Sequence, residues 1–128
     1  MSDKIKILIA DDEKINHLFY REILPVDKFE IIIAESGIEA LEKYNKYSGE
    51  IDCILMDMKM PELDGFSTAK QIRKIDTKIP IIAQTAYALH EDIARALNAG
   101  CNDYITKPIK EEILLNKIYN LVEHRNTI

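Results

Sequence analysis

Residues 51–66 of the chain read Ile-Asp-Cys-Ile-Leu-Met-Asp-Met-Lys-Met-Pro-Glu-Leu-Asp-Gly-Phe. The largely apolar run Ile51–Met56 predicts a short strand, because near-continuous apolar character suits a strand that is buried on both faces of a sheet. A loop that contains Pro61 follows, and Asp64 is the type of residue that caps the first turn of a helix. This stretch therefore predicts a buried strand, a polar loop that begins at Asp57, and a helix.

The same alternation of strand and helix extends in both directions along the chain. Apolar runs predict four more strands, at Ile5–Ala10, Phe29–Ala34, Ile79–Gln84 and Tyr104–Thr106. Apolar residues recur at helical spacing after each strand. Ser36 with Glu39 forms the pattern of a capping box, and Gly100 is placed to end a helix. Five strand–helix units in strict alternation predict an α/β fold with helices on both faces of a parallel sheet.

The composition predicts one soluble globular domain over residues 1–128, with its core at about residues 4–124. The formal net charge of -5 argues against nucleic-acid binding through a basic face. We find no membrane span or signal peptide and expect a cytoplasmic protein. Cys53 and Cys101 are expected to be small buried residues in a reducing compartment. The three histidines are expected to be solvated or at element edges: His17, His90 and His124.

Polar side chains directly follow four of the predicted strands. They are Asp11 and Asp12, then Asp57, then Thr85, then Lys107. In an open parallel sheet, function collects at the carboxyl ends of the strands. Three carboxylates at one edge repel each other unless a cation joins them, and Mg²⁺ suits such an oxygen-rich site with few protein ligands. The carboxylates and their cation, the Thr85 hydroxyl and the Lys107 ammonium together are the groups that phosphoryl transfer needs.

Four motifs resemble the receiver domains of two-component response regulators and hybrid histidine kinases. They are Ile-Leu-Ile-Ala-Asp11-Asp12, Ile-Leu-Met-Asp57-Met-Lys-Met-Pro-Glu-Leu-Asp64-Gly65, Ile-Ile-Ala-Gln-Thr85-Ala86 and Asp-Tyr104-Ile-Thr-Lys107-Pro108. The resemblance covers about residues 4–124. It implies a flavodoxin-like, doubly wound sheet of strand order 2-1-3-4-5 and a cis peptide bond before Pro108.

The resemblance also implies a role for each residue of the acidic site. Asp57 would be the phosphoacceptor, attacking a phosphohistidine on a histidine kinase or a histidine phosphotransfer domain. Asp12, Asp57 and the backbone carbonyl of Lys59 would bind Mg²⁺, and Asp11 would act through a water molecule. Lys107 would pair with a phosphoryl oxygen.

Further residues would act as a switch or tune the lifetime of the phosphoryl group. By the resemblance, Thr85 would hydrogen-bond to the phosphoryl group and Tyr104 would swing inward. Side chains of Lys59 and Tyr87 would lie over the phosphate. The fourth helix, fifth strand and fifth helix would form a surface for a partner or a homodimer. Asn16 and the run 85–88 look more like the receiver of a hybrid kinase than a stand-alone chemotaxis regulator.

Three other interpretations stay open at this point. A small phosphohydrolase of the haloacid-dehalogenase type also uses an Asp nucleophile and Mg²⁺, but it needs a second Asp where Lys59 stands. A degenerate receiver that serves only as an interaction module is disfavoured, because all five site residues are present. A flavodoxin relative is disfavoured because Asp11 and Asp12 replace a phosphate-cradling loop. We therefore expect a signalling phosphoacceptor and not a metabolic enzyme.

Overall fold

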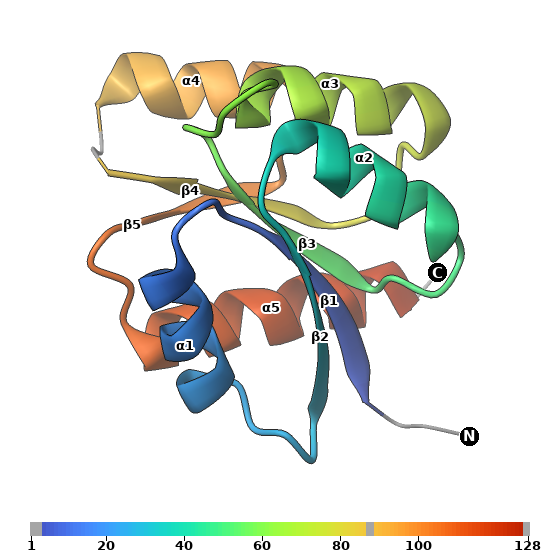
Figure 1. Ribbon diagram of the computed structural model, residues 1–128, viewed down its shortest axis with the longest axis vertical. Helices are drawn as coiled ribbons and strands as arrows, with labels where there is room; N and C mark the ends of the chain where they lie inside the picture. Colours follow the sequence, from blue (N-terminus) through green and yellow to red (C-terminus); the bar gives the residue numbers. More distant parts are fainter. Residues whose placement is uncertain (1–3, 87–88, 127–128) are drawn as a thin grey trace.

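The computed structural model describes residues 4–86 and 89–126. Its strands form one parallel sheet in the order β2-β1-β3-β4-β5, as predicted (Figure 1). The strands are β1 (Ile5–Ala10), β2 (Phe29–Ala34), β3 (Cys53–Asp57), β4 (Ile81–Thr85) and β5 (Asp103–Thr106). The helices are α1 (Lys14–Ile23), α2 (Gly37–Lys46), α3 (Gly65–Ile75), α4 (His90–Asn98) and α5 (Glu111–Asn126).

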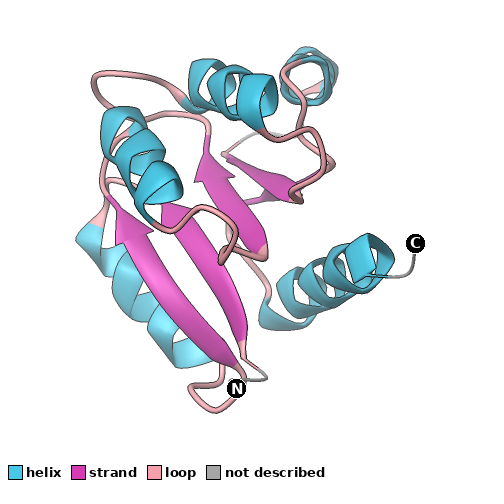
Figure 2. Cartoon of the chain, turned by 90° about the vertical axis from the view of Figure 1, so that its right-hand side faces the viewer, coloured by secondary structure: helices cyan, strands magenta, loops and turns pink. Residues whose placement is uncertain are grey.

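Helices cover both faces of the sheet, which confirms the predicted layers. In Figure 1, α2, α3 and α4 lie on one side of the strands, and α1 and α5 lie on the other. Figure 2 shows the same arrangement from the side, with the twisted strands between the two helical layers. Each layer has its own apolar core, because successive strand residues point to opposite faces. Leu55 and Ile82 pack toward α1 and α5, whereas Ile54 and Ile81 pack toward the other three helices.

Two strands are shifted toward their carboxyl ends relative to the prediction. β3 begins at Cys53 and β4 at Ile81, two residues later than expected in each case. Pro80 has no amide hydrogen to donate to a neighbouring strand, which accounts for the later start of β4. Pairing also continues further: Met58 N–H donates to the carbonyl of Gln84 at 3.1 Å. Asp57 and Thr85 are therefore the last residues of their strands and not the first residues of loops.

Side-chain caps fix where two helices start. Ser36 Oγ accepts from the amide of Glu39 at 3.0 Å, the predicted half of the capping box. The other half differs, because the Glu39 carboxylate accepts from the amide of Glu35 at 3.3 Å. Asp64 caps α3 as predicted, accepting from the amide of Ser67 at 2.8 Å. These caps set the direction of the loops at the carboxyl edge of the sheet.

The peptide bond between Lys107 and Pro108 is cis, as the resemblance implied. Cys53 and Cys101 are both buried and not joined in a disulfide, also as expected. Within residues 4–86 and 89–126, none of the helices has the length and apolar character that a membrane crossing requires.

Gly65 places the start of α3 directly against β3. Its amide donates to the carbonyl of Met58 at 3.0 Å, and a methyl group here would overlap the Asp57 carbonyl oxygen and come within 2.7 Å of Met58 Cα. We expect Gly65→Ala to lower the free energy of unfolding by about 1–3 kcal/mol, as overpacking typically does. Urea denaturation measures this loss. Gly49→Asn is the control, because nothing lies within 4 Å of its added Cβ; only its φ of +84° opposes a side chain, and Asn is among the residues that tolerate such a φ best, so the loss should be smaller. Equal losses at the two glycines would contradict the argument.

Candidate functional site

Three carboxylates converge where β1 and β3 end. The parallel register places Ala10 opposite Met56, so that the next residues, Asp11 and Asp57, are neighbours. Asp11, Asp12 and Asp57 each offer one carboxylate oxygen, and these oxygens all lie within 4.8 Å of one another. Asp11 is fully buried and Asp57 is 4% exposed, whereas Asp12 is exposed. The structure thus brings together the acidic residues that the sequence singled out.

Asp57 is held between two donors. The backbone amide of Lys59 donates to its Oδ1 at 3.0 Å, and Lys107 Nζ donates to its Oδ2 at 3.3 Å. Burial raises the pKa of Asp57 above its ordinary value, and the nearby charge of Asp11 raises it further. The two donors oppose that rise in pKa, because both stabilise the ionised form. A single cation in the acidic cluster would relieve the remaining repulsion.

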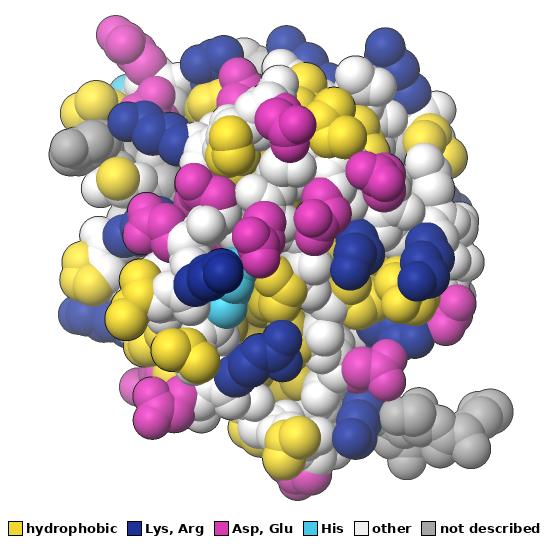
Figure 3. Space-filling view, in the orientation of Figure 1, with side chains coloured by type: hydrophobic (Ala, Val, Ile, Leu, Met, Phe, Trp, Pro, Cys, Tyr) yellow, Lys and Arg dark blue, Asp and Glu magenta, His cyan; other side chains and the backbone are white. Residues whose placement is uncertain are grey.

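A cavity of about 370 Å³ opens beside Asp57. Thr85, at the end of β4, lines it together with Lys59 and Lys107. Phe66 from the start of α3 and Asp92 from α4 also line the cavity. Figure 3 shows Asp and Glu side chains gathered across the middle of one face of the molecule. Such a surface raises the local concentration of cations.

The predicted switch and tuning residues are only partly placed. Tyr104 lies in β5, half-buried against the apolar core under α2, α3 and α4, and Lys117 Nζ lies 5.6 Å from its ring centroid. The side chain of Lys59 is exposed beside the cavity. Tyr87 lies outside the described residues.

Sequence reasoning missed the residues that surround Asp11. Gln84 and Tyr20, which are 0% and 1% exposed, both contact its carboxylate. His17 was expected to be solvated or at an edge, and that expectation is wrong. The side chain of His17 is 9% exposed, and its Nε2 lies 2.6 Å from the carbonyl oxygen of Asp11. One signal was available in the sequence: Gln84 is an amide at the end of an otherwise apolar strand.

A family model described as the response regulator receiver domain matches residues 7–119. Hybrid signal transduction histidine kinase I of Dictyostelium discoideum is 38% identical over 120 residues, which cover 88% of this chain and 7% of that protein. Chemotaxis protein CheY of Bacillus subtilis is 36% identical over 114 residues, which cover 88% of this chain and 93% of CheY. The chain therefore spans a small part of the hybrid kinase and nearly all of the chemotaxis protein.

Solved structures agree with this assignment. The receiver domain of a sensor histidine kinase from Pseudomonas aeruginosa matches with a TM-score of 0.84 and 32% sequence identity, covering 94% of this chain and 98% of that one. In that structure a magnesium ion is coordinated in the active-site cleft. The fold and the family match over residues 7–119 agree, and the chain belongs to the response regulator receiver domain family of two-component signalling.

Proposed function

We propose that this receiver domain takes a phosphoryl group onto Asp57 in a Mg²⁺-dependent reaction with a phosphohistidine donor. The donor would be a histidine kinase or a histidine phosphotransfer domain. One observation carries the proposal: the buried Asp57 carboxylate lies between the Lys107 ammonium, at 3.3 Å, and the carboxylates of Asp11 and Asp12. A nucleophilic oxygen, a fixed positive charge and a set of cation ligands thus share one site.

In the proposed reaction an oxygen of Asp57 forms a bond to phosphorus while the bond from phosphorus to the donor's imidazole nitrogen breaks. The imidazole leaves with the electron pair and is protonated by water. Lys107 stands beside the carboxylate and would pair with an oxygen of the incoming phosphoryl group. The amide of Lys59 holds the other Asp57 oxygen and so keeps the carboxylate oriented.

The residues present fit Mg²⁺. The converging ligand atoms are all carboxylate oxygens, which are the ligands that this hard cation prefers. Asp12 and Asp57 would hold the ion with the backbone carbonyl of Lys59, and Asp11 would act through a water molecule. When bound, the ion would neutralise the charge that gathers on the phosphoryl and carboxylate oxygens.

The switch would run from Thr85 to Tyr104. Thr85 lines the same cavity as Asp57 and Lys107, and this supports the proposal that its hydroxyl would hydrogen-bond to a phosphoryl group there. Ala83 pairs with Tyr104 in the β4–β5 register, which links the two elements directly. The surface of α4, β5 and α5 would then carry the signal to a partner or a second copy of the chain. The effect of Lys59 and Tyr87 on phosphoryl lifetime stays a prediction.

The partner's docking surface is proposed from two exposed apolar residues on α1. Ile15 is 71% exposed and Leu18 is 67% exposed. Ile15 also lines a pocket between α1 and Pro108, and Lys107 of the acidic site lines the same pocket. A helix of the donor that packs on this apolar face would bring its phosphohistidine close to Asp57.

Phosphoryl uptake is the first test. Incubation with Mg²⁺ and acetyl phosphate should add one phosphoryl group per chain, read by intact mass. The adduct should be absent in Asp57→Asn and in the presence of a chelator. Asp27→Asn, which changes an exposed aspartate of the α1–β2 loop, should keep it. Repeated hydrolysis of acetyl phosphate without a stable adduct would instead favour the phosphohydrolase interpretation.

The raised pKa of Asp57 predicts a gain in stability when its charge is removed. Burial disfavours the ionised form, so ionised Asp57 costs the folded protein stability at pH values above its folded-state pKa. Asp57→Asn should therefore unfold at higher urea than the unmodified protein at pH 7 without metal. This difference should shrink as the pH falls toward about 4, where Asp57 becomes protonated in both folded and unfolded chains.

Saturating Mg²⁺ should reverse this order of stability at pH 7, because the ion should bind the unmodified protein more tightly than the variant, which lacks one carboxylate ligand. Glu42→Gln, an exposed carboxylate on α2, should change neither comparison. If the metal-free Asp57→Asn protein is less stable than the unmodified protein at pH 7, the charge of Asp57 does not destabilise the folded state.

Docking on α1 is tested by comparing two phosphodonors. Leu18→Glu should slow phosphoryl transfer from a phosphorylated histidine phosphotransfer domain by about 10-fold or more, because a buried charge disrupts an apolar contact. Its rate with acetyl phosphate should stay near that of the unmodified protein. Val26→Glu alters another exposed apolar residue, 81% exposed beyond the end of α1, and should affect neither rate. Equal slowing by both variants would argue against docking on this face.

A further inference from the structure

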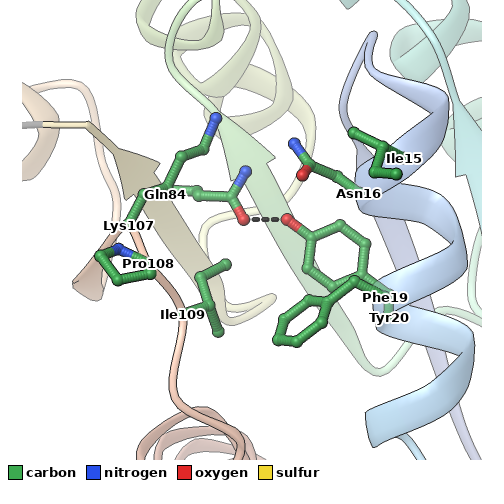
Figure 4. Close-up of a pocket in the computed structure, with 8 residues that line it drawn as sticks. All are labelled: Ile15, Asn16, Phe19, Tyr20, Gln84, Lys107, Pro108 and Ile109. Carbon is green, nitrogen blue, oxygen red and sulfur yellow. Dashed lines mark hydrogen bonds between the residues drawn. The ribbon is translucent and has the colours of Figure 1, made fainter.

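A buried chain of hydrogen bonds runs from α1 to β4 next to the acidic cluster. The hydroxyl of Tyr20 donates to Gln84 Oε1, and Figure 4 shows these two side chains meeting between the helix and the strand. Gln84 Nε2 in turn donates to Asp11 Oδ2 at 3.0 Å. Burial and the Asp11 charge raise the pKa of Tyr20, so its hydroxyl keeps its proton and serves as a donor.

The two oxygens of Asp11 have different surroundings. Oδ1 accepts from the amide of Glu13 at 2.9 Å. Oδ2 accepts from Gln84 Nε2 and from Asn16 Nδ2, each at 3.0 Å, and the Tyr20 hydroxyl lies 3.2 Å away. Rotation of the carboxylate would break hydrogen bonds to the loop, the helix and the strand together. Asp11 is thus fixed in one orientation before any cation arrives.

Gln84 occupies a position where packing alone would favour an apolar side chain. It points to the same face as Ile82, into the core that lies against α1 and α5. A buried amide costs stability unless its oxygen and nitrogen are both paired, and here Tyr20 and Asp11 pair them. The backbone of Gln84 also accepts from the amide of Met58, the residue after Asp57. Gln84 therefore contacts the segments that carry two of the three carboxylates.

We infer that Gln84 and Tyr20 are positioning residues for the cation that joins Asp11, Asp12 and Asp57. They act through Asp11, whose carboxylate they hold where one of its oxygens lies within 4.8 Å of oxygens from the other two. The inference rests on the proposed Mg²⁺-dependent function and adds the groups that set its metal affinity. Side chains that hydrogen-bond to direct metal ligands typically change metal affinity about 10–100-fold when they are removed, and because Asp11 would reach the ion through a water molecule we expect a loss at the lower end of that range.

The test measures Mg²⁺ affinity by isothermal titration calorimetry. Gln84→Met keeps the length of the side chain and removes its donor, and it should weaken Mg²⁺ binding by about 10-fold. Tyr20→Phe removes only the hydroxyl and should weaken binding by a smaller factor. The double variant should bind about as weakly as Gln84→Met alone, because both residues act on the same carboxylate.

Tyr44→Phe is the matched control. Tyr44 is also a buried tyrosine, and its hydroxyl donates to an aspartate, Asp76 Oδ2, at 2.8 Å. That pair joins α2 to the segment after α3, away from the acidic cluster. Tyr44→Phe should lower stability to urea without changing Mg²⁺ affinity. If Gln84→Met does not fold, Tyr20→Phe and its control carry the test.

Phosphorylation by acetyl phosphate supplies a second measurement. In Gln84→Met the Mg²⁺ concentration that gives the half-maximal rate should rise, while the rate at saturating Mg²⁺ returns toward that of the unmodified protein. Mg²⁺ affinity that is unchanged or tighter in folded Gln84→Met and Tyr20→Phe would overturn the inference. A wild-type protein that binds Mg²⁺ but never takes a phosphoryl group would overturn the proposed function alone.

Discussion

The parallel register of β1 and β3 forces two buried carboxylates, Asp11 and Asp57, to share one edge of the sheet, with Asp12 beside them. Like charges at this separation repel each other strongly where water is scarce. Much of the surrounding structure offsets that repulsion. Lys107 reaches Asp57 from the end of β5, and side chains of α1 and β4 donate to Asp11. The strand order is what brings these donors within reach.

The two buried carboxylates have different hydrogen-bonding surroundings, and this difference fits two different roles. Asp11 is surrounded by donors on both oxygens and is held firmly. Asp57 has one backbone donor and one flexible ammonium, and it faces a cavity. A fixed carboxylate suits a residue that organises a cation, whereas a less restrained one beside open space suits a nucleophile. Environment alone thus separates two chemically identical side chains.

The architecture and most of the site residues could be predicted from the sequence, because apolar runs and strand ends are local patterns. A local pattern does not show whether a strand lies at the edge of the sheet. Ile31, Ile32 and Ile33 form an unbroken apolar run, yet they are only partly buried because β2 is an edge strand. Nor could the sequence pair Tyr20 with Gln84, since 64 positions separate them and only the folded sheet brings the two side chains together. His17 was misjudged for a different reason: its partner is near in the sequence, but it is the backbone carbonyl of Asp11, and a backbone acceptor leaves no residue pattern to find.

We propose that folding gathers Asp11, Asp12 and Asp57 around one divalent cation in front of Lys107. A crystal structure of the protein with Mg²⁺ and beryllofluoride tests it most directly, since beryllofluoride mimics a phosphoryl group on a carboxylate. We expect the ion to contact Asp12 and Asp57, and the beryllofluoride to be attached to Asp57 within reach of Lys107 and Thr85. Magnesium bound elsewhere, or a beryllofluoride group on any other side chain, would contradict it.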